Sequence, residues 1–98
     1  MAVLKVFGKG NENYLSFPIE GYTLALDFKI SPDILKFLEK LDEEILALGG
    51  RIYLTKDVRL HRKHFSSFYP KLSNFLDIRR QFHAENFKSL QSERLGIS

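Results

Sequence analysis

A strand pattern that runs directly into a helix start signal limits the folds open to this chain. From residue 22 to residue 30 apolar and polar side chains alternate, as they do in a strand with one buried face. The tripeptide Ser-Pro-Asp at 31–33 then supplies an N-cap hydroxyl, a proline for the first helical position and an acid for the first turn. Apolar residues at three- and four-residue steps predict a helix of about 16 residues, which ends at two glycines at 49–50.

Two further strands and a helical tail complete the expected fold. Ala2–Phe7 is rich in β-branched and aromatic residues and stops at a glycine-rich turn, and Arg51–Thr55 resumes an extended pattern after the helix. Later in the chain the spacing is helical, in three short pieces at 61–68, 72–82 and 89–95. The sequence therefore predicts an α+β domain with a small, mainly antiparallel sheet, one long helix packed on it, and a C-terminal tail of short helices.

Size and composition narrow the class of protein. The chain has 98 residues, of which 44% are hydrophobic and 28% charged, enough for one domain with a single core. The absence of cysteine excludes disulfides, thiolate metal sites and a cysteine nucleophile. No apolar run approaches the roughly 18 residues of a membrane span, and the amino terminus lacks the pattern of a signal peptide. We therefore expect a cytoplasmic protein without a membrane span.

Charge is unevenly distributed between the two halves of the chain. Residues 1–50 carry five lysines and eight acidic side chains, a net charge of −3, whereas residues 51–98 carry ten basic and four acidic side chains, a net charge of +6. A basic half favours an anionic partner, so one hypothesis is a non-catalytic binding module for an acidic protein or nucleic acid. The aromatic residues in the basic segment, Phe65, Phe68 and Tyr69, have the helical spacing of a core, however, and we expect no nucleic-acid partner.

The residues with metal or acid–base chemistry form no recognisable site. His61 and His64 are three residues apart and His83 lies farther on, but no nearby carboxylate completes a ligand set, so we expect solvated histidines and no metal. The acidic run at 42–44 is expected to be the solvated face of the long helix. The sequence contains neither a Walker loop nor a dinucleotide-binding glycine fingerprint.

Several segments nevertheless follow one another in an informative order. They cover nearly the whole chain: LKVFGKGN at 4–11, LSFPI at 15–19, GYTLALDF at 21–28, GGRIYLTKD at 49–57, and the segments 65–70 and 75–80. This order resembles the last part of FAD-linked oxidases of the vanillyl-alcohol oxidase type, and among them the sugar and sugar-lactone oxidases. The resemblance implies that 1–56 is the C-terminal part of a cap domain over the substrate, and that 57–98 is a helical tail returning to an FAD-binding domain, both within one compact unit.

The resemblance gives roles to two residues of the third expected strand. Lys56 aligns with a lysine beside the flavin ring, where an ammonium would stabilise the negative charge that the ring gains on reduction, a catalytic and cofactor-binding role. Tyr53 aligns with a tyrosine of the substrate pocket. On the residues alone, Lys56 is an exposed lysine at a strand end, and Tyr53 is an amphipathic side chain packed on the sheet.

Three more substrate-binding residues follow from the same resemblance. Lys5 and Phe7 align with a lysine and a phenylalanine that line the pocket, and alternation places both on one face of their strand. Thr23 stands where related enzymes carry asparagine, and because threonine is also polar, the resemblance implies a polar contact with the substrate at this position. The tail departs from the family, because His83 and Ala84 replace an Asp-Pro pair.

The leading hypothesis is therefore a C-terminal fragment of an FAD-dependent oxidoreductase that oxidises a hydroxyl carbon of a sugar or polyol. The glycine-rich FAD-binding segment of such enzymes lies outside this chain, so we expect the isolated chain neither to bind FAD nor to catalyse the reaction. Its expected partners are the FAD-binding domain of the parent protein and a sugar-like substrate. Surface meant for that domain also predicts self-association of the isolated chain.

Overall fold

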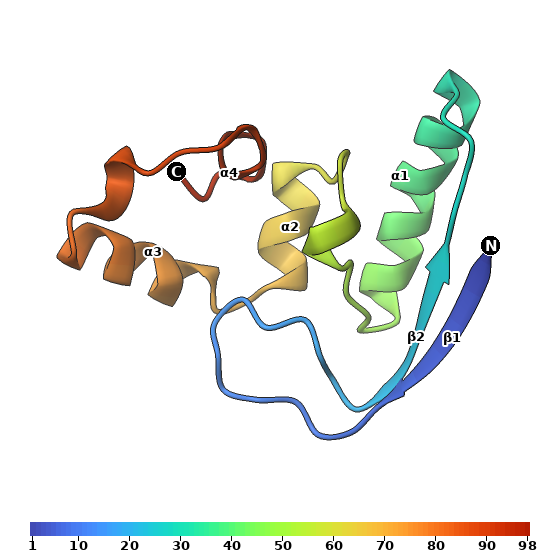
Figure 1. The fold of residues 1–98 in the computed structure, drawn as a ribbon, viewed down its shortest axis with the longest axis horizontal. Helices are drawn as coiled ribbons and strands as arrows, with labels where there is room; N and C mark the ends of the chain where they lie inside the picture. Colours follow the sequence, from blue (N-terminus) through green and yellow to red (C-terminus); the bar gives the residue numbers. More distant parts are fainter.

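The computed structural model describes all 98 residues apart from the side chain of Lys56. The molecule measures 40 × 34 × 22 Å, with a hairpin and a long helix on one side and a helical tail on the other (Figure 1). Its strands, helices and 3₁₀ turns (η) are β1 Ala2–Phe7, β2 Gly21–Leu26, α1 Pro32–Ala47, η1 Leu54–Lys56, α2 Arg62–Phe68, α3 Leu72–Gln81, η2 Ala84–Asn86 and α4 Leu90–Leu95. The predicted α+β class with a small antiparallel sheet is confirmed.

β1 and β2 form an antiparallel hairpin in which Lys5 pairs with Thr23. β1 has the predicted bounds, whereas β2 ends before residue 30 because β1 begins at Ala2 and offers no partner beyond it. The alternation gathers apolar side chains on one face, and this face is exposed: Leu4, Val6, Tyr22 and Leu24. The prediction that this face is buried is wrong, because the sheet has two strands and no described part of the chain covers the face.

α1 begins and ends as the sequence predicts. The Ser31 hydroxyl accepts a hydrogen bond from the Ile34 amide at 3.2 Å, and Gly49 provides the left-handed exit with φ of +78°. The helix packs mainly against α2, and its Phe37 ring lies 6.4 Å from that of Phe28, just after β2. α1 therefore connects the hairpin to the helical half of the molecule (Figure 1).

The predicted third strand at 51–55 is wrong. This segment is irregular and then turns into η1, and its carbonyls bond to side chains instead of a neighbouring strand. The Tyr69 hydroxyl donates to the Ile52 carbonyl at 2.8 Å, and the Gln91 amide donates to the Leu54 carbonyl at 2.7 Å. The apolar alternation that suggested a strand reflects the packing of Ile52 and Leu54 against the core.

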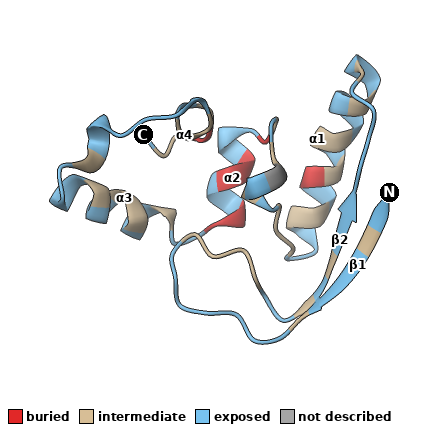
Figure 2. Ribbon diagram, viewed as in Figure 1, coloured by how far each residue is buried: buried red, intermediate tan, exposed pale blue. Residues whose placement is uncertain are grey.

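The core lies in the second half of the chain, around α2 and α4 (Figure 2). Five buried side chains form it: Leu60, Phe65, Phe68, Tyr69 and Leu95. The core role predicted for the three aromatic residues is confirmed. α2 and α4 carry most of this core, and Leu15 of the loop between the strands and Ile45 and Leu46 of α1 pack against it.

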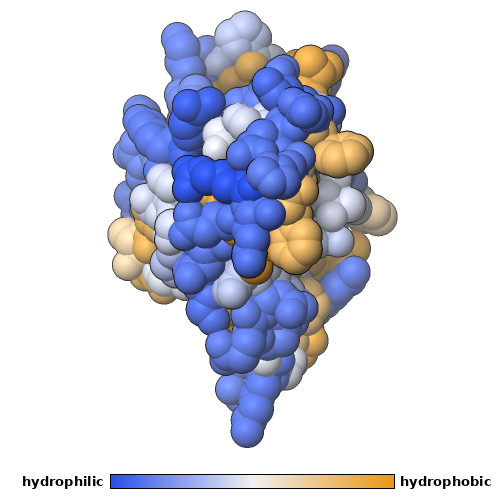
Figure 3. Space-filling model, turned by 90° about the vertical axis from the view of Figure 1, so that its left-hand side faces the viewer, coloured by the Kyte–Doolittle hydropathy of each residue, from blue (hydrophilic) through white to orange (hydrophobic). Residues whose placement is uncertain are grey.

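The three predicted short helices are all present, as α2, α3 and α4. Between α3 and α4 the chain passes through His83, whose φ of 53° is left-handed, and through η2. Apolar side chains remain exposed in this part of the molecule: Phe82, Phe87 and Leu90. From the side of the tail, hydrophobic side chains flank an otherwise hydrophilic face (Figure 3). None of the helices in the described part of the chain combines the length and apolar character that a membrane span requires.

Candidate functional site

Four residues predicted to bind substrate follow one another along one surface. Lys5 and Thr23 are directly opposite each other in the hairpin, and Phe7 lies on the same face of β1 as Lys5. The Phe7 ring meets the Phe17 ring edge-on at a centroid distance of 5.8 Å, and Phe17 lies 5.0 Å from the Tyr53 ring. We call the surface formed by Lys5, Phe7, Phe17, Thr23 and Tyr53 the aromatic wall.

Phe17 is the member of the aromatic wall that sequence reasoning did not assign to the site. It lies in the loop between the strands and is followed by Pro18, which holds the backbone extended. Its ring bridges Phe7 and Tyr53, residues that are far apart in sequence. The signal was present in the segment LSFPI, which belongs to the family resemblance, but the sequence does not show which rings it joins.

The aromatic wall is open to solvent. Tyr53 is 47% exposed, Lys5 is exposed, and Thr23 is partly buried. A hollow lined by residues 12–16 and Phe75 lies elsewhere, and no wall residue contributes to it. The wall therefore presents three aromatic rings, an ammonium and two hydroxyls on an open surface and not in a closed pocket.

The turn that follows Tyr53 contains the predicted catalytic lysine. Lys56 is the last residue of η1. The structure describes its backbone but not its side chain. At the end of η1 the Asp57 amide donates to the Leu54 carbonyl at 3.2 Å. The Gln91 amide bonds the same carbonyl from α4. The position of this turn thus depends on side chains that come from elsewhere in the fold.

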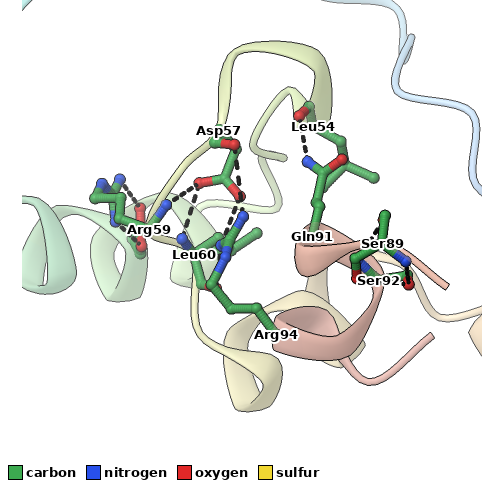
Figure 4. A network of polar contacts seen from close by, with 9 residues as sticks. Leu54, Asp57, Arg59, Leu60, Ser89, Gln91, Ser92 and Arg94 are labelled. Carbon is green, nitrogen blue, oxygen red and sulfur yellow. Dashed lines mark hydrogen bonds and ion pairs between the residues drawn. The ribbon is translucent and has the colours of Figure 1, made fainter. Parts of the chain in front are cut away.

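Asp57 is the polar centre of the segment that joins η1 to α2 (Figure 4). Its carboxylate is 2% exposed, and one oxygen accepts hydrogen bonds from the amides of Arg59 and Leu60 at 3.0 and 2.8 Å. The other oxygen accepts from Arg94 Nη1 at 2.9 Å. Three donors, one of them oppositely charged, satisfy this buried carboxylate, and it fixes the backbone that surrounds it.

The start of the same segment is held by Tyr69 and Arg51. Tyr69 is buried and donates its hydroxyl to the Ile52 carbonyl, and burial raises the pKa of this phenol to about 12. The Arg51 guanidinium lies 5.5 Å from the Tyr69 ring centre and bonds the Ser16 carbonyl at 2.8 Å, next to Phe17. Arg51 therefore links the loop that carries Phe17 to the segment that carries Tyr53.

The expectation that residues 42–44 form a solvated face is wrong for Asp42. Asp42 is fully buried and forms a two-pronged ion pair with Arg59, with N–O distances of 2.6 and 2.9 Å. The hydrogen bonds to Asp42 raise the pKa of the Arg59 guanidinium above its usual value. Sequence reasoning missed this pair because the partners belong to different elements, α1 and the segment before α2.

Several basic side chains of residues 51–98 form ion pairs with acidic side chains. Besides Arg59, other basic side chains of this half lie against acids: Arg94 with Asp57, Lys71 with Glu12, and Arg80 with Asp77. Positive charge engaged in this way contributes less to attracting an acidic protein or nucleic acid. The structure therefore weakens the hypothesis of a basic binding module.

The expectation of solvated histidines is wrong for His64, which is buried between α2 and α1. His61 Nε2 contacts the Glu39 carboxylate, and His64 Nε2 lies 3.6 Å from the Glu43 carboxylate. Carboxylates therefore do lie near the histidines, contrary to the sequence argument, because α1 supplies them. No three His, Cys, Asp or Glu side chains of the described residues are arranged to hold a metal ion.

The fold is that of a small α+β unit with the aromatic wall on its surface, and comparisons with known proteins show similarity to an oxidase. Over 96 residues the chain is 38% identical to decaprenylphosphoryl-β-D-ribose oxidase of Mycolicibacterium smegmatis, an alignment that covers 97% of this chain and 21% of that oxidase. The resemblance predicted from the sequence is confirmed at this level.

A second relative of known sequence has no assigned activity. The chain is 35% identical over 97 residues to an uncharacterised protein in the mprA 5′ region of Streptomyces coelicolor, covering 97% of this chain and 26% of that protein. No protein-family model matches the chain. The chain thus spans between a fifth and about a quarter of the length of these relatives.

Proposed function

We propose that this chain is the C-terminal part of an FAD-dependent oxidoreductase that oxidises a hydroxyl carbon of a sugar or polyol. The observation that carries the proposal is that residues aligned with a substrate pocket, although scattered along the sequence, meet on the aromatic wall. Similarity to a ribose oxidase along 97% of the chain supports it. In this proposal residues 1–56 complete a cap over the substrate, and residues 57–98 return to the FAD-binding domain.

The chemistry of the aromatic wall suits a polyhydroxylated ligand. The hydroxyls of Thr23 and Tyr53 donate and accept hydrogen bonds, the Lys5 ammonium donates, and the rings of Phe7 and Phe17 offer apolar surface to the faces of a sugar ring. Because the wall is open, the rest of the pocket would come from the remainder of the parent protein. The proposed role of these side chains is to bind and orient the hydroxyl that is oxidised.

The described residues fit one side of an FAD site and not the whole of it. They offer the turn at 53–57, with a lysine at its end, but no glycine-rich loop that opens a helix and binds phosphate. FAD, when bound, would accept the hydride from the substrate. Lys56 would hold an ammonium near the ring, where it favours the negative charge that arrives with the hydride. The phosphates of FAD would be held by the other domain.

This assignment makes the chain an incomplete enzyme by itself. The partner that it requires is the FAD-binding domain of the parent protein, and the expected compartment is the cytoplasm. The isolated 98 residues should therefore be colourless and inactive, whereas the parent protein should carry a flavin.

The test is to express the chain with the coding sequence that precedes it in the same reading frame and to record the visible absorption of the product. A flavin spectrum is expected. Lys56→Met should then slow flavin reduction by roughly tenfold or more, because a few kcal/mol of electrostatic stabilisation are lost. Lys29→Met, which removes an exposed lysine after β2, is the matched control and should leave the rate unchanged.

Two results would count against the proposal. A colourless parent protein would refute the flavoenzyme assignment as a whole. Unchanged reduction kinetics in Lys56→Met, with flavin bound, would remove Lys56 from the mechanism while leaving the class of enzyme intact.

A further inference from the structure

We propose that α4 is a positioning element for the turn that carries Tyr53 and Lys56, and that Gln91 and Arg94 are its positioning residues. The functional meaning of this inference rests on the proposed role of Lys56, whereas the mechanical part rests on contacts within this chain. Neither Gln91 nor Arg94 is placed at the substrate or the flavin; both would act through the turn.

The first contact joins α4 to the start of the turn. The Gln91 side-chain amide donates to the Leu54 carbonyl at 2.7 Å, across 37 positions of sequence. Leu54 is the first residue of η1, and its carbonyl also closes the turn by accepting the Asp57 amide. A 3₁₀ helix of a single turn is weak on its own. The second donor from Gln91 therefore holds the carbonyl on which the geometry of the turn depends.

The second contact joins α4 to the end of the turn. Arg94 Nη1 donates to Asp57 Oδ2 at 2.9 Å and to the Leu60 carbonyl at 2.8 Å. Asp57 directly follows Lys56 and is itself fixed by the two amides of Arg59 and Leu60. Gln91 and Arg94 are three residues apart, which places them on one face of α4, so a single helix face holds the turn at both ends (Figure 4).

α4 is itself held in place by the core and by its two caps, so it can fix the position of the turn. Leu95 is fully buried in the core, and Ser89 and Ser92 form a reciprocal capping box at the start of the helix. Gly96 closes the other end in a left-handed conformation with φ of +77°. A six-residue helix is unstable alone, so its burial and its two caps are what fix the positions of Gln91 and Arg94.

The mechanical part can be tested by amide hydrogen exchange on the 98-residue chain. Gln91→Met and Arg94→Met should each speed exchange at the Asp57 and Leu60 amides by roughly five- to tenfold, because each removes a bond from α4 that holds one end of the turn. Arg94→Lys should restore part of the protection at Leu60, since a lysine can still reach Asp57. Arg62→Met is the matched control, because Arg62 also bonds α4, at the Glu93 carbonyl, but does not touch the turn.

An equal rise in exchange in α1 and in the core would overturn the inference, because it would mean that Gln91 and Arg94 support the whole fold and not the turn. Unchanged exchange at Asp57 and Leu60 would overturn it as well. A local rise confined to residues 54–60, absent in Arg62→Met, supports it.

The functional part is tested in the flavin-containing parent protein by combining substitutions. If Gln91 acts through the turn, Gln91→Met should slow flavin reduction severalfold, and Gln91→Met combined with Lys56→Met should be no slower than Lys56→Met alone. Additive losses would overturn the positioning role. If Lys56→Met alone has no effect, the proposed role of Lys56 fails instead, and the exchange experiment still decides whether α4 holds the turn.

Discussion

The hairpin and the helical half of this molecule contain similar apolar side chains but use them differently. Leu24 in β2 is 57% exposed on a face shared with Leu4, Val6 and Tyr22, whereas Leu60 before α2 is fully buried. A two-stranded hairpin is at best marginally stable without a further layer. The helical half carries its own core, while the hairpin has an apolar face that suits a cover from outside the chain, in line with the proposal of a larger parent enzyme.

The largest expected difference between the two regions concerns their ion pairs. Asp42→Ala should lower the free energy of unfolding by roughly 3 to 4 kcal/mol, because it leaves the mostly buried Arg59 guanidinium without its partner. Asp27→Ala, which removes an exposed contact to the amino terminus after β2, should change it by less than about 0.5 kcal/mol. Urea denaturation of both variants checks this, and equal losses would contradict the view that contacts between α1 and the helical half contribute more stability than those of the hairpin.

The same leucine-to-alanine substitution in each region compares the stability of the hairpin with that of the helical half more directly. Leu60→Ala should cost roughly 3 kcal/mol, the loss typical of a fully buried leucine, whereas Leu24→Ala should cost less than about 0.5 kcal/mol. The midpoints of thermal or urea unfolding measure both. If Leu24→Ala were as costly as Leu60→Ala, the exposed face of the hairpin would have to be covered in solution, as self-association of the chain would do.

A smaller effect is expected from pH and is specific to the helical half. The pKa of Tyr69 is raised to about 12 in the folded chain, against about 10 in the unfolded chain. The protonated phenol therefore stabilises the fold fully below pH 10, and this contribution, on the order of 2 kcal/mol, is lost as the pH rises towards 12. Between pH 8 and pH 11, the free energy of unfolding measured in urea should fall more steeply for the unsubstituted 98-residue chain than for Tyr69→Phe. Identical pH dependence would contradict the assignment.

Elements set by local signals were predictable from the sequence. Ser31 and Pro32 favour the start of α1 locally, and the β-branched and aromatic content of Ala2–Phe7 with the glycine-rich turn after it gives the bounds of β1. The false strand at 51–55 arose because alternation reports burial, and here the buried residues pack on a helical core while Tyr69 and Gln91 satisfy the backbone. An extended segment becomes a strand only if a neighbour pairs with it, and the sequence does not show that neighbour.

The sequence indicated which residues belong to the candidate site better than it indicated how they are arranged in space. Alternation places Lys5 and Phe7 on one face, but the register that sets Thr23 opposite Lys5 is a property of the hairpin. The bridging role of Phe17 and the burial of Asp42 depend on contacts between distant elements. The roles of these residues, and that of Lys56, remain proposals carried by the family resemblance and by their convergence.

The bond between Gln91 and Leu54 has a consequence for the order in which this molecule is assembled. The two residues are 37 positions apart, so during synthesis the turn that carries Lys56 leaves the ribosome well before the helix that ties it down. The hairpin and α1 both precede the turn in sequence, but the proposed flavin-facing turn acquires its final shape only when α4 docks. A nascent chain stalled between these two positions would carry the lysine on an untethered loop.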